Sequence, residues 1–230
     1  MTSVLVASDW HLSPASPPAH ARLALEFLAL ARAEGARAIL NGDVFDELFF
    51  GRTLAEAAHP AVVRAVDALA AEGRLARTRG NHDPSAGDER TVVDVPGTGP
   101  VLVTHGHQVD PVARSPAGRL GDAISRRLGR TAAVRWAAHL AEEGARAAAG
   151  RAMVSAFRRR ALAIVEREGF ALGVFGHVHV AHAARGDRYA NAGSLRGGVL
   201  EFLELGPGGV RLRTIHARAE ALQGSASRSR

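Results

Sequence analysis

Short apolar runs recur along the chain, and polar residues follow each run at once. Between the first runs, apolar residues recur at helical spacing instead. This spacing predicts helices over 20–34 and 60–72. The short runs are typical of buried strands and cover residues 4–7, 38–40, 101–103 and 172–175, with a weaker one at 74–79. This alternation predicts a largely parallel sheet with helical cover, and therefore an α/β fold.

The pattern changes after residue 103. Apolar stripes at helical spacing predict a helical segment over about 110–170, formed by Leu120, Ile124 and Leu128, by Val134 to Leu140, and by Met153, Phe157 and Ala161. Further on, strands are predicted at 188–192, 199–205 and 210–216, as an antiparallel set. We therefore expect one domain over 1–222, interrupted by a helical insertion, and a disordered tail over 223–230.

Each strand-like run leads into a short motif of Asp, His or Asn. In chain order the motifs are Asp9-Trp10-His11, Gly42-Asp43-Val44-Phe45-Asp46, Gly80-Asn81-His82-Asp83, Thr104-His105-Gly106-His107 and Gly176-His177-Val178-His179. Oxygen and imidazole donors gathered at strand ends, without a thiolate among them, suit a pair of hard-to-intermediate divalent metals.

Composition narrows the class of protein. The chain has no cysteine, so a disulfide framework is excluded, and it has no long unbroken apolar stretch. The first apolar run is short and leads directly into a motif, which favours a first strand over a signal peptide. Together these features favour a cytoplasmic location and agree with a soluble enzyme.

Charge is concentrated in one part of the chain. The net charge is +6, every basic residue is an arginine, and the segment 110–170 alone holds twelve arginines against six acidic residues. A solvated basic face is one interpretation of this excess. The other is an anionic partner, which could be a phosphate-bearing substrate, an acidic membrane surface or nucleic acid.

The five motifs together resemble the signature of the calcineurin-like metallophosphoesterase family, which has DxH, GDxxD, GNHD, a histidine after a strand, and GHxH. The resemblance implies a four-layer α-β-β-α sandwich of two mixed sheets. It also implies hydrolysis of phosphoester or diphosphate bonds by a hydroxide that two metal ions share.

The resemblance also implies a role for each motif residue. Asp43 would bridge the two ions, and Mn(II) is the expected metal, although Fe, Zn or Co suit the same donors. The ligands of the first ion would be Asp9, His11 and His179, and those of the second Asn81, His105 and His177. His82 would act as a catalytic acid or donor to the phosphoryl group, with Asp83 holding its other ring nitrogen. Asp46 would orient a ligand, and His107 would line the pocket.

A narrower resemblance concerns the substrate. The helical insertion and the sequence GDVFDELFFG are similar to the UDP-2,3-diacylglucosamine diphosphatase family, whose lid binds a lipid-linked substrate. The resemblance implies a lid whose apolar stripe accepts acyl chains, while a diphosphate meets either Arg158, Arg159 and Arg160 or Arg126 and Arg127. GNHD and HGH stand here in place of patterns such as GNRD and HGD, which departs from that family.

Two alternatives belong to other classes. A phosphodiesterase acting on nucleotides or nucleic acid would fit the basic excess, but aromatic residues for base stacking are few and no nucleic-acid module is recognisable. Nucleic acid is therefore not the expected partner. A catalytically decayed metal-binding scaffold would be expected to lack ligands or the histidine of GNHD, and here every position is filled.

Overall fold

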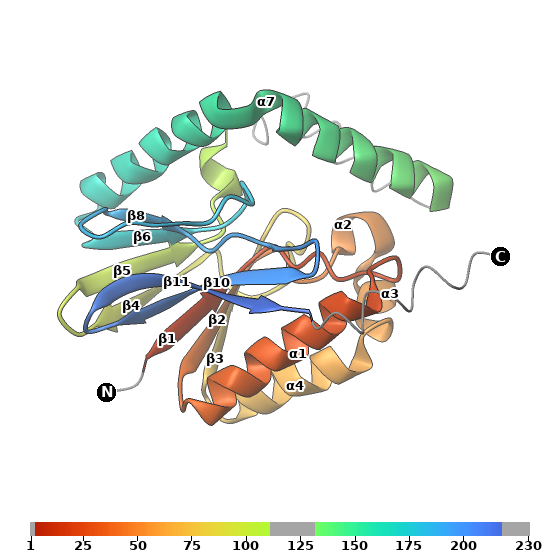
Figure 1. The fold of residues 1–230 in the computed structure, drawn as a ribbon, viewed down its shortest axis with the longest axis horizontal. Helices are drawn as coiled ribbons and strands as arrows, with labels where there is room; N and C mark the ends of the chain where they lie inside the picture. Colours follow the sequence, from red (N-terminus) through yellow and green to blue (C-terminus); the bar gives the residue numbers. More distant parts are fainter. Residues whose placement is uncertain (1–2, 111–131, 218–230) are drawn as a thin grey trace.

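Two β-sheets lie face to face between layers of helix in the computed structural model, which describes residues 3–110 and 132–217 and gives the backbone alone for 132–149 (Figure 1). The first sheet has the order β11-β10-β1-β2-β3, with β9 paired to β10. Its strands are β1 (Val4–Ala7), β2 (Arg37–Asn41), β3 (Leu75–Thr78), β9 (Leu195–Arg196), β10 (Val199–Gly206) and β11 (Gly209–His216). Strands β1, β2 and β3 are parallel, and β10 joins β1 antiparallel, so this sheet is mixed.

The second sheet has the order β4-β5-β6-β8-β7. Its strands are β4 (Arg90–Val95), β5 (Gly99–Thr104), β6 (Leu172–Phe175), β7 (His182–Ala183) and β8 (Tyr189–Asn191). Strands β5, β6 and β8 run parallel, while the edge strands β4 and β7 are antiparallel to their neighbours. The carboxyl ends of β5 and β6 therefore share one edge of this sheet.

Side-chain alternation along the strands divides the core into three parts. On β1, Leu5 and Ala7 face the helices α1 (Pro18–Ala33) and α4 (Pro60–Ala71), while Val6 faces the second sheet. Val6 meets Val103 and Val174 in the core between the sheets. A third cluster lies under α7 (Ala132–Arg167). The order helix, sheet, sheet, helix confirms the predicted four-layer sandwich.

The short helices stand at one end of the first sheet, where α2 (Glu47–Phe50) and α3 (Arg52–Ala57) follow β2, and the 3₁₀ turn η1 (His107–Val109) follows β5 (Figure 1). The predicted helices over 20–34 and 60–72 correspond to α1 and α4, and both begin at a proline, which is favoured at the first turn of a helix.

One prediction of strand pairing is wrong. The strand predicted at 188–192 forms as β8, but it pairs parallel with β6 in the second sheet, while β10 and β11 form a hairpin in the first sheet. The three C-terminal strands are therefore not one antiparallel set. The reason is burial: Tyr189 packs on Phe175 and Phe157 beneath α7, which places its strand in the other layer.

The helical segment forms α7, which packs on β6 and β8 of the second sheet and bends at Gly150, where φ is +49° (Figure 1). Its second half supplies Phe157, Ala161 and Val165 to the core, which agrees with the third predicted stripe. The stripes at Leu120 and at Val134 to Leu140, and the tail 223–230, concern residues whose side chains lie outside the described part. No helix in the described part of the chain combines the length and apolar character that crossing a bilayer requires.

Candidate metal centre

The predicted ligands all lie in loops that leave the carboxyl ends of strands. Asp9 follows β1, Asp43 follows β2 and Asn81 follows β3, three parallel neighbours of the first sheet. The remaining ligands follow strands of the second sheet, with His105 after β5, and His177 and His179 after β6. Because the two sheets face each other, these loops meet over one edge of the sandwich.

Two glycines allow the loops to approach this closely. A Cβ atom on Gly80 would lie 1.9 Å from Oδ1 of Asp43, and one on Gly176 would lie 2.0 Å from Oγ of Ser8 and 2.6 Å from Oδ2 of Asp9. Neither glycine has a positive φ, so the requirement is for space around the carboxylates.

Backbone strain is confined to the predicted ligands. In the described residues, five non-glycine residues have positive φ: Asp9 (57°), His11 (46°), Asp43 (54°), His177 (70°) and His179 (55°). Each such conformation costs free energy of order 1–3 kcal/mol and persists where surrounding structure imposes it, which is characteristic of functional sites. The strained residues are therefore five of the seven predicted metal ligands, Asn81 and His105 being the two without a positive φ.

The first group of donors consists of Asp9, His11 and His179. Oδ1 of Asp9 lies 3.0 Å from Nε2 of His179 and 3.8 Å from Nε2 of His11. The same two ring nitrogens face each other at 3.2 Å. The other oxygen of Asp9 accepts hydrogen bonds from Oγ of Ser8 (2.5 Å) and from the backbone N–H of His177 (3.0 Å), which fixes the carboxylate.

The second group consists of Asp43, Asn81, His105 and His177. Nε2 of His105 lies 3.1 Å from Oδ2 of Asp43 and 3.3 Å from Oδ1 of Asn81. The same oxygen of Asn81 lies 3.1 Å from Nδ1 of His177. Ligand atoms around one ion at about 2.1 Å stand roughly 3–3.5 Å apart, so these spacings suit a shared cation.

Asp43 belongs to both sides of the site. Its Oδ2, which faces His105, also lies 3.8 Å from Nε2 of His11. Its Oδ1 accepts a hydrogen bond of 2.7 Å from the backbone N–H of His82. This buried carboxylate therefore stands between the two donor groups, as the predicted bridge requires.

The burial and the chemistry of the donor atoms also indicate divalent cations, independently of the distances between these atoms. Oδ1 of Asp9 and Oδ2 of Asp43 are buried and have no hydrogen-bond partner in the described structure. A buried, unsatisfied carboxylate oxygen is costly, and coordination to a cation satisfies it. The donor atoms are carboxylate and amide oxygen and imidazole nitrogen, which suit Mn, Fe, Zn or Co.

Charge in the site is strongly coupled. Burial alone would raise the pKa of Asp9 and Asp43, but the charges of neighbouring histidines, among them His105, outweigh it and hold both below their usual range. Burial would lower the pKa of His105, but Asp43 and Asp9 outweigh it and raise that pKa to about 9. Burial, with the charge of His82, keeps the pKa of His11 well below its ordinary value. The two carboxylates therefore attract positive charge strongly.

The structure corrects the predicted partner of His82. Its Nδ1 lies 3.0 Å from Oδ1 of Asp46, and both side chains are buried. Asp83, predicted to hold that ring, instead accepts hydrogen bonds from the backbone N–H groups of Asp43 (2.7 Å), Val44 (2.9 Å) and Gly80 (2.8 Å). Burial and the charge of Asp43 raise the pKa of Asp83 to about 7.

Asp83 therefore ties the second and third motif loops together, and Asp46 orients His82. The two aspartates end the second and the third motif, and of the two it is Asp46 that contacts the His82 ring.

The remaining predicted residues are placed less centrally. The ring of His107 lies 5.6 Å from that of His105, and burial followed by the charges of His105 and His177 lowers its pKa to about 4. Arg158 is bound by Asp187 (2.5 Å) and lies over the Tyr189 ring, so its guanidinium already has a carboxylate partner. Arg159 and Arg160 are exposed, and Arg126 and Arg127 lie outside the described residues.

Three residues that contribute to the site, Ser8, Asn41 and Asp110, lie outside the five motifs. Oγ of Ser8 reaches both Asp9 and the carbonyl of Asn41 (2.8 Å), and that carbonyl also lies 2.9 Å from Nδ1 of His105. Oδ2 of Asp110 lies 2.9 Å from Nε2 of His177. A strand-end serine and asparagine just before two motifs were a weak signal, whereas Asp110 had none.

Comparison with known proteins settles the family. A family model described as calcineurin-like phosphoesterase matches residues 2–181. The chain belongs to this family. It is therefore a metal-dependent phosphoester hydrolase, and the fold and the donor groups agree with that assignment. No curated protein sequence matches the chain.

Solved structures are similar in fold. A dimetal phosphatase from Danio rerio has a TM-score of 0.50 at 9% identity, covering 94% of this chain and 99% of that chain. A predicted phosphoesterase from Streptococcus pneumoniae has a TM-score of 0.46 at 16% identity, covering 93% and 98%. Vps29 from Entamoeba histolytica complexed with Zn²⁺ has a TM-score of 0.45 at 14% identity, covering 94% and 100%. At these identities the likeness concerns the fold alone.

Proposed function

We propose that this enzyme hydrolyses a phosphodiester or diphosphate bond at a centre of two divalent ions bridged by Asp43. The observation that carries the proposal is the position of Oδ2 of Asp43, buried and without a hydrogen-bond partner in the described structure, 3.1 Å from His105 and 3.8 Å from His11. When bound, two such ions lower the pKa of water to give a nucleophile and neutralise phosphoryl charge.

The chain's own residues have separate tasks in this reaction. Asp9, His11 and His179 would hold one ion, and Asn81, His105 and His177 the other. His82 is fixed by Asp46 beside the site and would donate a proton or a hydrogen bond to the departing or charged phosphoryl oxygen.

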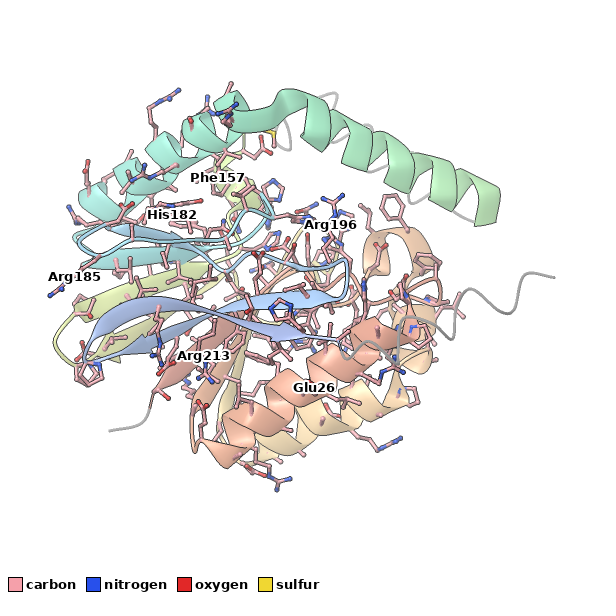
Figure 2. All side chains as sticks on the ribbon, in the orientation of Figure 1. Glu26, Phe157, His182, Arg185, Arg196 and Arg213 are labelled. Atoms are coloured by element: carbon pink, nitrogen blue, oxygen red, sulfur yellow. The ribbon has the colours of Figure 1, made fainter. Side chains whose placement is uncertain are left out.

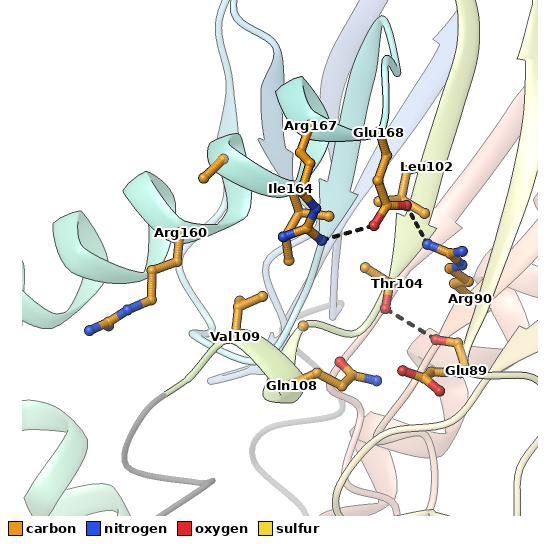
Figure 3. A pocket seen from close by; sticks show the side chains of 12 residues that line it. Glu89, Arg90, Leu102, Thr104, Gln108, Val109, Arg160, Ile164, Arg167 and Glu168 are labelled. Atoms are coloured by element: carbon orange, nitrogen blue, oxygen red, sulfur yellow. Dashed lines mark hydrogen bonds and ion pairs between the residues drawn. The ribbon is translucent and has the colours of Figure 1, made fainter.

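The substrate class that we propose is a diphosphate bearing an apolar group, as in the UDP-diacylglucosamine diphosphatases. A cavity of about 710 Å³ lies between α7 and the outer face of β5, and Gly106 in its wall adjoins the ligand His105 (Figure 3). Its lining includes the apolar side chains of Leu102, Val109 and Ile164. Much of the remaining lining is polar or charged, including Glu89, Arg90, Arg160, Arg167 and Glu168, so the cavity suits a group that joins an apolar part to a polar or anionic one.

The arginines around this cavity are not equivalent. Arg90 and Arg167 both pair with Glu168, at 2.5 and 3.1 Å. Within the part of the chain that the structure describes, Arg160 has no carboxylate within ion-pair distance, and Figure 3 shows its side chain directed away from those pairs. Arg160 is therefore the arginine of this cavity that is free to meet an anionic group.

A panel of substrates tests the proposal. Metal-free protein is reconstituted separately with Mn²⁺, Zn²⁺, Co²⁺ and Fe²⁺ and assayed on p-nitrophenyl phosphate, bis(p-nitrophenyl) phosphate and UDP-2,3-diacylglucosamine. We expect metal-dependent turnover, with the highest kcat/KM on the acylated diphosphate. Preference for the monoester would refute the substrate class, and inactivity on all three with two ions bound would refute the hydrolase.

His82→Ala tests the division of tasks. The variant is expected to retain two metal equivalents by elemental analysis and to lose turnover by about 10²–10⁴-fold. His82 also stands within reach of His11 and Asp43 as a third group of donors, so loss of one metal equivalent would instead make it a ligand.

A further inference from the structure

A buried carboxylate contacts one of the candidate ligands from outside the donor groups. Oδ2 of Asp110 lies 2.9 Å from Nε2 of His177, and the two residues are 9% and 6% exposed. Asp110 directly follows η1, whereas His177 belongs to the loop after β6. The contact therefore joins two loops on the second-ion side of the site.

The contact determines which nitrogen of His177 can bind a cation. A carboxylate accepts the ring proton, so Nε2 carries hydrogen and Nδ1 keeps its lone pair. Nδ1 is the nitrogen that faces Oδ1 of Asn81 at 3.1 Å, on the side of the donors. The nitrogen that faces the donors, Nδ1, is therefore not the one that carries the proton, Nε2. A histidine that binds a metal ion requires this arrangement.

His105 is arranged in the same way with the nitrogens exchanged. Its Nδ1 lies 2.9 Å from the backbone carbonyl of Asn41, which leaves Nε2 to face Asp43. The two histidines of the second group are thus each held from behind, one by a neutral carbonyl and the other by a carboxylate. A carboxylate behind a ligand histidine raises its basicity as well as fixing its orientation.

We propose that Asp110 is a positioning residue for the second metal ion, acting through His177. The proposal rests on the two-ion centre of the proposed function. It also connects that ion to the helical segment, because Phe157 of α7 lies 6.0 Å from the His177 ring, centroid to centroid, and points from α7 toward the sheet (Figure 2). His177 is therefore held by Asp110 on its Nε2 side and packed by α7.

Metal binding tests the proposal independently of turnover. Metal-free wild type, Asp110→Ala and Asp110→Glu are titrated with Mn²⁺ by calorimetry. Two binding steps are expected for the wild type, and in Asp110→Ala one step should weaken about 10–100-fold while the other is unchanged. Asp110→Glu should recover part of the affinity, because it restores an acceptor for Nε2–H.

The tautomer of His177 gives a second readout. In ¹⁵N–¹H spectra of the Zn²⁺-loaded wild type, His177 should carry its proton on Nε2, and in Asp110→Ala this preference should weaken. Asp187→Asn is the matched control, since it alters another histidine–aspartate pair (His182 Nε2 to Asp187 Oδ2, 2.8 Å) in the same sheet. It should leave both Mn²⁺ affinities unchanged.

The outcomes separate cleanly. Unchanged Mn²⁺ affinities and an unchanged tautomer in folded Asp110→Ala would overturn the proposal and leave Asp110 a packing residue. Weakening of both binding steps to the same degree in Asp110→Ala and in Asp187→Asn would also overturn it, as a general loss of stability. A wild type that binds two ions without hydrolysing any substrate would refute the proposed function but not this role.

Discussion

Gly80 should be indispensable for the metal centre although it contributes no ligand. In Gly80→Ala the new Cβ would lie 1.9 Å from Oδ1 of Asp43, whereas Cβ atoms essentially never approach a non-bonded atom within 3.0 Å. The carboxylate must therefore move by at least about 1.1 Å, the difference between these distances. Metal–ligand distances tolerate only about ±0.2 Å, so Asp43 can no longer serve both ions.

We expect Gly80→Ala to lose at least one metal equivalent and to lower kcat/KM by about 100-fold or more, as misplacement by about 1 Å does. Forcing a methyl group into a packed site should also cost about 1–3 kcal/mol in the free energy of unfolding. Elemental analysis, the phosphodiester assay and urea unfolding of the metal-free protein measure these quantities.

The matched control is Gly208→Ala. Gly208 has no positive φ and nothing within 4 Å of an added Cβ, so this variant should behave as wild type. Two metal equivalents and wild-type kcat/KM in Gly80→Ala would show that the Asp43 carboxylate is not held where the structure places it, and the bridging argument would fall.

Three further outcomes are expected. Asp46→Asn should keep both metals but lower kcat by about 10²-fold, because His82 loses its orienting carboxylate; unchanged kcat would contradict this role. Phe157→Ala should lower the free energy of unfolding by about 3–5 kcal/mol in urea, since the ring is 3% exposed; a loss below about 1 kcal/mol would show that α7 is not packed as described. Burial raises the pKa of Asp187, but the hydrogen bond from His182 and other donors leave it lowered overall. Its contribution to stability is therefore present above the unfolded pKa of about 3.9 and lost as pH falls below it. Between about pH 5 and about pH 3 the wild type should lose more stability than Asp187→Asn, and parallel losses would contradict the assignment.

Much of the fold could be predicted because its signals are local. Apolar runs that end at a polar motif predict both the strands and the edge at which their loops meet, and therefore the cluster of motif residues. The four layers are implied by the resemblance of the five motifs to a known family, not by the apolar pattern. The sheet to which β8 belongs is not a local property. It is decided by the packing of Tyr189 under α7. This contact joins segments that are distant in the sequence, and the pattern of residues near 189 does not predict it.

The errors within the site have a similar origin. Asp46 and Asp83 both stand in motifs near His82, and side-chain direction decides which of them meets the ring. Asp110 lies in no motif and reaches His177 only because the loops after β5 and β6 adjoin. Residues that act through another side chain leave little trace in a sequence, since their role depends on tertiary contacts.

The left-handed backbone at the five candidate ligands has a consequence for how this protein can change. Glycine adopts such a conformation freely, whereas Asp and His do not, so each of these positions holds a residue that folding alone would not select. Replacing them one at a time with glycine should relax the loops and, at some positions, yield a sturdier but inert protein. Mutational drift without selection for turnover would therefore erode these positions first, and a homologue with glycine there would have kept the scaffold and abandoned the chemistry.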